Sequence, residues 1–185
     1  MAIPTREQAE ALLRRYELPA GIVTHARGVA RVAAEAARLV ASAGVPVDIN
    51  LVEVAALLHD IDKVETRKSG APHGIVGARW LTELGFVELA APVASHPVNC
   101  LLDEERFPRG WPSVILSIAD RRVAQRFVSA DERIDDLVAR HPEYRESLEA
   151  ARLPGRALES ELAEVSRLTP VELDARLRSA WEAGA

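Results

Sequence analysis

The segment Glu53 to Lys63, EVAALLHDIDK, constrains the possible folds of this sequence more than any other segment. Its apolar residues recur at helical spacing, so it predicts a buried helix. That helix ends in an imidazole and a carboxylate, His59 and Asp60. A carboxylate that leaves water becomes neutral unless cations or hydrogen-bond donors compensate its charge. The segment therefore requires polar partners from other parts of the chain.

The composition favours an all-helical domain, because 48% of the residues are apolar while aromatic residues are few. A chain of 185 residues can bury one good core and does not demand two. We expect a single domain over residues 1–185, with a core over about 20–130 and a helical appendage over about 131–185. There is no apolar run of about 20 residues and no signal-peptide pattern, so we expect no membrane span.

Charge and cysteine content narrow the function classes further. The formal net charge is −5, and nucleic-acid binders usually carry a basic stripe, so we expect no nucleic-acid partner. The single cysteine, Cys100, cannot form an internal disulfide, which fits a reducing compartment. We therefore expect a cytoplasmic protein.

Caps and helix breakers divide the chain into segments. Thr5 with Gln8 predicts a capping box, and Thr169, Pro170 and Glu172 together predict the start of a last helix. The predicted helices cover about residues 5–17, 22–43, 50–60, 73–84, 86–95, 113–127, 131–151, 154–168 and 170 onward, with loops over 63–72 and 99–112.

Six polar residues lie at the ends or on the apolar faces of these predicted helices. They include four of the five histidines, and apart from one adjacent pair each belongs to a different helix or its end. Imidazoles and carboxylates bind Zn, Fe, Ni, Cu or Mn without help from a thiolate. Two metals about 3.5–4 Å apart suit the hydrolysis of phosphate esters and anhydrides. The candidate metal ligands are His25, His59, Asp60, His73, His96 and Asp120.

Several short segments around these residues carry a family resemblance. LLHDIDK is similar to an HDIGK-type segment, and THARGVARVAAEAA to the helix of a first histidine. HGIVGARWL, His96 and SIADRR are similar to the later histidine and closing aspartate motifs. Together they cover about residues 21–127 and resemble the HD-domain metal-dependent phosphohydrolases. The resemblance implies an all-α HD-domain helical bundle with additional C-terminal helices.

The resemblance also implies an arrangement of the ligands. It implies that His25, His59, Asp60 and Asp120 hold one metal. It implies that Asp60 bridges to a second metal, which His73 and His96 hold. Iron and manganese are the expected metals, with zinc, nickel, cobalt and magnesium as alternatives.

The chain is most similar to small bacterial two-metal members that split diadenosine tetraphosphate into two ADP molecules. The implied substrate is therefore a small phosphorylated molecule such as a nucleotide. Asp60 and Lys63 are the expected catalytic residues. The expected contacts to substrate phosphate are Lys63, Arg27, Arg121 and Arg122.

Other interpretations of the same residues stay open. A histidine on an apolar face can be a hydrogen-bonded core residue, and the arginines can form surface salt bridges. Asp62, where the family has glycine, is either an acceptor for a histidine N–H or an exposed acid. The alternative functions are a single-metal nucleotidase or phosphodiesterase, a nucleotide-sensing module without activity, and a two-metal oxygenase. The last helices pack against the core or against a second subunit, so a homodimer also stays open.

Overall fold

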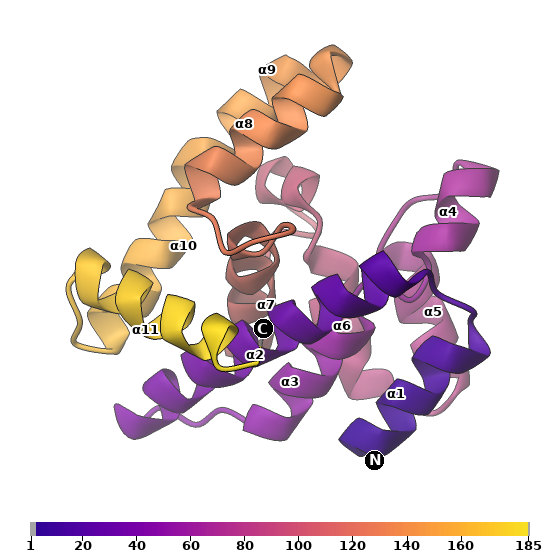
Figure 1. Ribbon diagram of the computed structural model, residues 1–185, viewed down its shortest axis with the longest axis horizontal. Coiled ribbons are helices and arrows are strands. Elements are labelled where there is room, and N and C mark those ends of the chain that lie inside the picture. Colours follow the sequence, from indigo (N-terminus) through magenta and orange to yellow (C-terminus); the bar gives the residue numbers. More distant parts are fainter. Residues whose placement is uncertain (1–2, 185) are drawn as a thin grey trace.

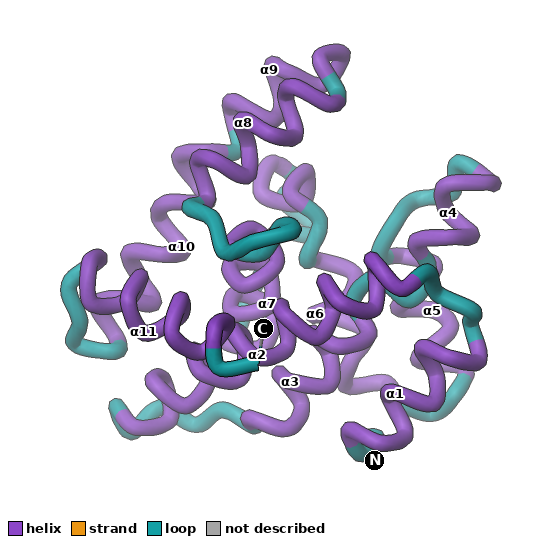
Figure 2. Tube along the Cα trace, viewed as in Figure 1, coloured by secondary structure: helices purple, strands orange, loops and turns teal. Residues whose placement is uncertain are grey.

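Residues 3–184 of the computed structural model form helices joined by turns, and no strand occurs among them (Figure 2). Their only β-type pairing is an isolated bridge between Val123 and Phe127. The predicted all-α fold is therefore confirmed. The α-helices are α1 (Arg6–Arg15), α2 (Ala20–Ser42), α3 (Ile49–Leu58), α4 (Lys63–Ser69), α5 (Ile75–Glu83), α6 (Ala90–Ser95), α7 (Trp111–Arg122), α8 (Ala130–Arg140), α9 (Arg145–Ala150), α10 (Arg152–Val165) and α11 (Pro170–Glu182).

Helix α2 is the central element of the core and packs against α3, α7 and α11 (Figure 1). Its buried face carries Ala26, Ala30, Ala33 and Ala37, each fully buried. Their spacing of three and four residues places these small side chains on one face, so neighbouring helices can approach closely. The central position of α2 fixes the place of every side chain that its first turns carry.

The C-terminal part of the chain divides into two regions. Helix α11 packs on α2, and its Leu173 and Leu177 belong to the main hydrophobic core. Helices α8 and α9 project away from that core (Figure 1) and are held by a smaller apolar cluster of Ile134, Val138 and Leu148.

The predicted caps at both ends of the chain are confirmed. The Thr5 side chain accepts a hydrogen bond from the backbone N–H of Gln8, whose side chain accepts in return from Thr5. Thr169 and Glu172 form the same capping box at the start of α11, with Pro170 in its first turn. These caps satisfy backbone N–H groups that the helices leave free.

Three expected boundaries are wrong. The loop expected over residues 63–72 begins with the short helix α4, which ends at Gly70 with a positive φ of 70°. The helix expected over 131–151 is broken after α8, because Pro142 lacks the N–H that a continuing helix needs. Helix α7 ends at Arg122, and the extended Val123 then pairs with Phe127.

Membrane crossing would require a long apolar helix, and none occurs among residues 3–184.

Candidate metal centre

The six predicted ligands come from separate parts of the chain and meet in one place. His25 lies in the second turn of α2, and Asp120 lies in the last turn of α7. His59 and His96 are the C-terminal caps of α3 and α6. Asp60 follows α3 directly, and His73 comes just before α5. These five helices therefore place the six polar groups at one junction, where they are mostly buried.

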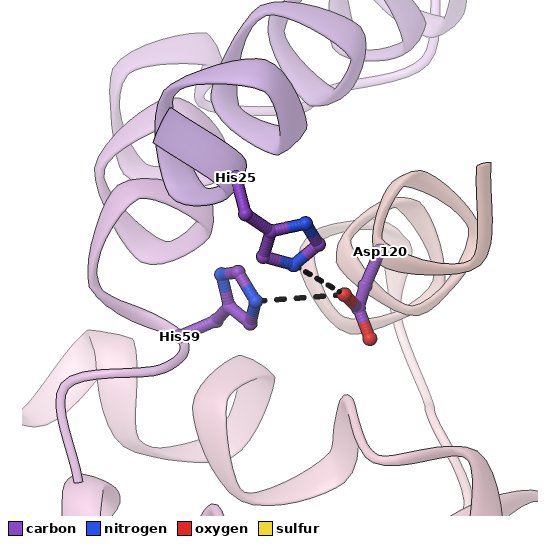
Figure 3. Close-up of side chains that lie close together, drawn as sticks. All are labelled: His25, His59 and Asp120. Atoms are coloured by element: carbon purple, nitrogen blue, oxygen red, sulfur yellow. Dashed lines mark hydrogen bonds and ion pairs between the residues drawn. The ribbon is translucent and has the colours of Figure 1, made fainter. Parts of the chain in front are cut away.

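One group consists of His25, His59 and Asp120 (Figure 3). The Oδ1 atom of Asp120 lies 3.0 Å from His25 Nε2 and 3.5 Å from His59 Nε2. Figure 3 shows both rings turned toward this one carboxylate oxygen. Two nitrogen donors and one oxygen donor thus face a common point.

A second group is centred on the Asp60 carboxylate. Its Oδ1 atom lies 3.0 Å from His73 Nε2, 3.6 Å from His59 Nε2 and 3.8 Å from His96 Nε2. The Nε2 atoms of His73 and His96 are 3.1 Å apart. Asp60 and His59 therefore connect this group with the one around Asp120.

Two of the imidazoles are oriented by backbone carbonyl groups outside the cluster. His59 Nδ1 lies 2.6 Å from the Ala56 carbonyl oxygen, and His96 Nδ1 lies 2.7 Å from that of Val93. A carbonyl oxygen only accepts, so in both rings Nδ1 donates, and in the neutral imidazole Nε2 then carries the lone pair that faces the cluster. Hydrogen bonds of this kind commonly orient metal-binding histidines.

The donor set fits a divalent metal ion. His59 Nε2 is buried and has no hydrogen-bond partner in the described part of the chain. Unpaired buried polar atoms are costly, so an atom of this kind indicates an unseen partner. The close approach of His73 Nε2 and His96 Nε2 also requires a cation or a proton between two lone pairs. A metal ion would satisfy both demands.

Asp62 is a buried acceptor rather than an exposed acid. Its side chain is fully buried, and its Oδ1 accepts a 2.7 Å hydrogen bond from His73 Nδ1. Its Oδ2 accepts from the backbone N–H groups of Gly74 and Gly77 at 2.9 and 2.8 Å. Burial raises the Asp62 pKa, but His73 and these backbone donors outweigh it and lower that pKa below its ordinary value. Asp62 thus fixes the ring that carries the His73 Nε2 lone pair.

The neighbouring charges keep the two carboxylate ligands, Asp60 and Asp120, in their ionised, metal-binding form. Burial opposes ionisation of Asp60, but His59, Lys63 and His73 hold its pKa well below the ordinary value. The same balance, with His25 and His59 as partners, lowers the pKa of Asp120. Carboxylates in this environment stay ionised at neutral pH.

The pKa of His96 is lowered as well, but here burial is the main cause. Burial, together with the neighbouring His59 and His73, lowers the pKa of His96 to about 3. Its imidazole is therefore neutral at physiological pH, which a metal ligand requires.

Lys63 lies beside the cluster and faces a cavity. Its ammonium is 3.0 Å from Asp60 Oδ1 and 3.1 Å from His73 Nε2. Lys63 lines a cavity of about 900 Å³ together with His25 and Asp60. A ligand in this cavity would therefore meet the ammonium and the cluster at once.

The three arginines expected at a substrate phosphate have other partners. Arg27 forms two hydrogen bonds with Glu10 of α1, at 2.8 and 2.6 Å. Arg121 is buried and donates to Ser117 Oγ and to the Gly155 carbonyl.

Arg122, the third of these arginines, pairs with Asp174 and with Glu159, on the C-terminal helices.

The structure also shows cavity residues that the sequence patterns did not single out. Arg126 precedes α8, and Arg133, Arg140 and His141 lie on α8 or at its end, all lining the same cavity. The side chain of His141 is 49% exposed. The sequence does contain a signal that could have identified this face of α8. Residues 133, 136, 137 and 140 are spaced so that they lie on one side of a helix.

Comparisons with known proteins identify the family to which this part of the chain belongs. A family model described as HD domain matches residues 22–168, which include all six candidate ligands. The uncharacterized protein MJ0778 of Methanocaldococcus jannaschii is 38% identical over 92 residues, 49% of this chain. The match covers 53% of that protein, so the chain spans about half the length of this relative. No solved structure matches the chain.

Proposed function

Because this chain belongs to the HD domain family, we propose that it is a metal-dependent phosphohydrolase with a centre for two divalent metal ions. The observation that supports the proposal is the buried Nε2 atom of His59, which has no hydrogen-bond partner among residues 3–184 and lies between two carboxylates. A metal ion bound there would give this atom a partner, and the neighbouring donors would complete its ligand set.

The proposed ligands divide between the two metals. His25, His59, Asp60 and Asp120 would hold one ion, and His73 and His96 would hold the other, with Asp60 bridging. The short distances from Asp60 to the three imidazoles support a bridging role. Iron or manganese is the proposed metal.

Bound divalent metals would lower the pKa of water and polarise phosphoryl oxygens, which is the chemistry that phosphoester hydrolysis requires. The chain itself contributes position and charge. Asp62 fixes the ring of His73, and the Lys63 ammonium can donate hydrogen bonds to a phosphate oxygen in the cavity. The proposal assigns no phosphate contact to Arg27, Arg121 or Arg122, since their guanidinium groups have other partners.

The proposed substrate is a nucleotide or another phosphorylated molecule of similar size, with a dinucleoside polyphosphate as the specific candidate. The cavity of about 900 Å³ is near the upper end of the range of about 300–1,000 Å³ for small-molecule sites. A cavity of this size accommodates a substrate much larger than a single phosphate.

The test is the metal content of the purified protein, measured by elemental analysis, beside His73→Ala and the control His141→Ala. We expect about two metals per chain in the native protein and the control, and about one in His73→Ala. Hydrolysis of diadenosine tetraphosphate is then assayed with iron and with manganese.

Two results would change this proposal. One metal per chain in all three proteins would favour the single-metal nucleotidase or phosphodiesterase. No metal after loading with iron or manganese would contradict the hydrolase and favour a nucleotide-binding module.

A further inference from the structure

The cavity beside the candidate metal centre is lined in part by α8, a helix that contributes none of the six candidate ligands. His25, Asp60 and Lys63 line one part of the wall. Another part comes from α8 and the segment before it. The α8 residues that line the cavity are Glu132, Arg133, Asp136, Leu137 and Arg140.

Spacing explains why these side chains share one wall. Residues 133, 136, 137 and 140 are separated by three and four positions, so they occupy one face of the helix. That face carries two guanidinium groups, a carboxylate and a leucine side chain. The other buried side of α8 packs Ile134 and Val138 against Leu148, which holds the helix in place.

The wall of the cavity carries more positive than negative charge. Five cationic side chains line it against three carboxylates, a net of two positive charges, whereas the whole chain carries −5. Such a local concentration of positive charge attracts anions. The five cationic residues are Lys63, Arg67, Arg126, Arg133 and Arg140.

On α8, two of these arginines share a single acid. Arg140 Nη2 lies 2.6 Å and Arg133 Nη1 lies 3.4 Å from the same oxygen, Oδ2 of Asp136. One carboxylate neutralises only one of the two guanidinium groups. Each guanidinium also has five N–H donors, so most of the donors remain free for an anion. Asp136 therefore positions the pair without cancelling its charge.

We propose that Arg133 and Arg140 form a second anion-binding subsite, which binds a phosphate group of the substrate remote from the group that is cleaved. This inference rests on the proposed function, because it assigns the substrate of the same cavity. It implies a preference for long substrates that carry several phosphates over simple phosphate monoesters.

The kinetic test uses the full-length protein with its metals and a double variant, Arg133→Ala with Arg140→Ala. The long substrate is diadenosine tetraphosphate, and the short one is p-nitrophenyl phosphate. We expect the KM for the long substrate to rise at least about tenfold while kcat changes less than about twofold. We expect the KM for the short substrate to stay the same.

Two further variants serve as controls. Arg145→Ala removes an exposed arginine of α9 that does not line the cavity, and it should leave both KM values unchanged. Arg140→Gln alone changes a side chain that is 49% exposed, so it should fold normally even where the double variant does not. It should still raise the KM for the long substrate about threefold.

A binding measurement separates this inference from the proposed function. Calorimetry with diadenosine tetraphosphate and the His59→Ala protein, with and without the two arginine changes, needs no turnover. Failure to hydrolyse either substrate would count against the hydrolase, but a loss of affinity from the arginine changes would still support the subsite. Equal affinity with and without those changes, or no binding at all, would overturn the subsite.

Discussion

At the scale of single residues, Asp62 shows how a side chain can orient a candidate metal ligand without being a ligand itself. It is fully buried and accepts three hydrogen bonds, one from His73 and two from backbone N–H groups at the start of α5. Since a buried carboxylate is stable only with such donors, Asp62 and the start of α5 hold each other in place.

This arrangement predicts the effect of Asp62→Asn. The new amide carries one acceptor oxygen instead of two, so at least one of the three donors loses its partner. We expect the affinity for the second metal to fall roughly 10–100-fold. The free energy of unfolding should fall by about 1–3 kcal/mol. Metal-titration calorimetry and urea denaturation measure the two effects.

The control for this variant is Glu65→Gln, which makes the same charge change at an exposed residue of α4. Glu65→Gln should change neither the metal affinity nor the free energy of unfolding. An unchanged metal affinity in Asp62→Asn would show that the orientation of His73 does not depend on this carboxylate.

The sequence was sufficient to identify the six clustered residues, but not the arginines that line the cavity beside them. Successive side chains on a helix are rotated by about 100°, so a residue next to a ligand points elsewhere. Arg27 is two positions after His25 and therefore lies on the other side of α2, where it meets Glu10. Arg121, one position after Asp120, is turned toward Ser117 and Gly155 in the same way.

At the scale of elements, the contact between α5 and the turn after α3 depends on a glycine. A Cβ atom on Gly77 would lie 3.2 Å from Ile61 Cγ2 and 3.3 Å from Asp62 Cγ. Both distances are shorter than ordinary van der Waals contacts, so any side chain here would push α5 away from Asp62. The backbone N–H of Gly77 would then move away from the carboxylate that it binds.

We therefore predict that Gly77→Ala destabilises the protein, although alanine is the better helix former by about 1 kcal/mol. The expected loss in the free energy of unfolding is about 1–3 kcal/mol, and metal binding should weaken as well. Gly21→Ala in α2 is the matched control, since its Cβ would meet no atom within 4 Å. Thermal unfolding should show a lower midpoint temperature for Gly77→Ala than for Gly21→Ala. Equal shifts of the two midpoints would contradict the packing argument.

The elements that sequence patterns missed are those without a strong apolar pattern. Helix α4 is short and polar, and only one of its residues is buried, so hydrophobic periodicity gave no signal for it. The break after α8 was marked by Pro142, yet the charged residues on both sides fit a continuous amphipathic helix. The cavity wall on α8 was missed because it depends on how α8 is placed, which no local pattern encodes.

At the scale of the whole molecule, the last helix is part of the main core although it is far from it in sequence. A Cβ atom on Gly28 of α2 would lie 3.2 Å from Nε1 of Trp181, so the two helices are in close contact. Leu177 is 1% exposed and belongs to the same apolar cluster as α2 and α3. We infer that α11 unfolds together with the helices of the candidate metal centre as one cooperative unit.

This inference predicts a large effect of Leu177→Ala on the stability of the entire molecule. Deleting a fully buried leucine side chain costs about 2–5 kcal/mol, from lost burial and from the cavity that remains. Val171→Ala in the same helix is the control, because Val171 is 78% exposed and the change should cost less than about 0.5 kcal/mol. Urea unfolding is followed by circular dichroism and by tryptophan fluorescence. A single transition at lower urea, the same for both probes, is expected, whereas two separate transitions would show that the C-terminal helices unfold on their own.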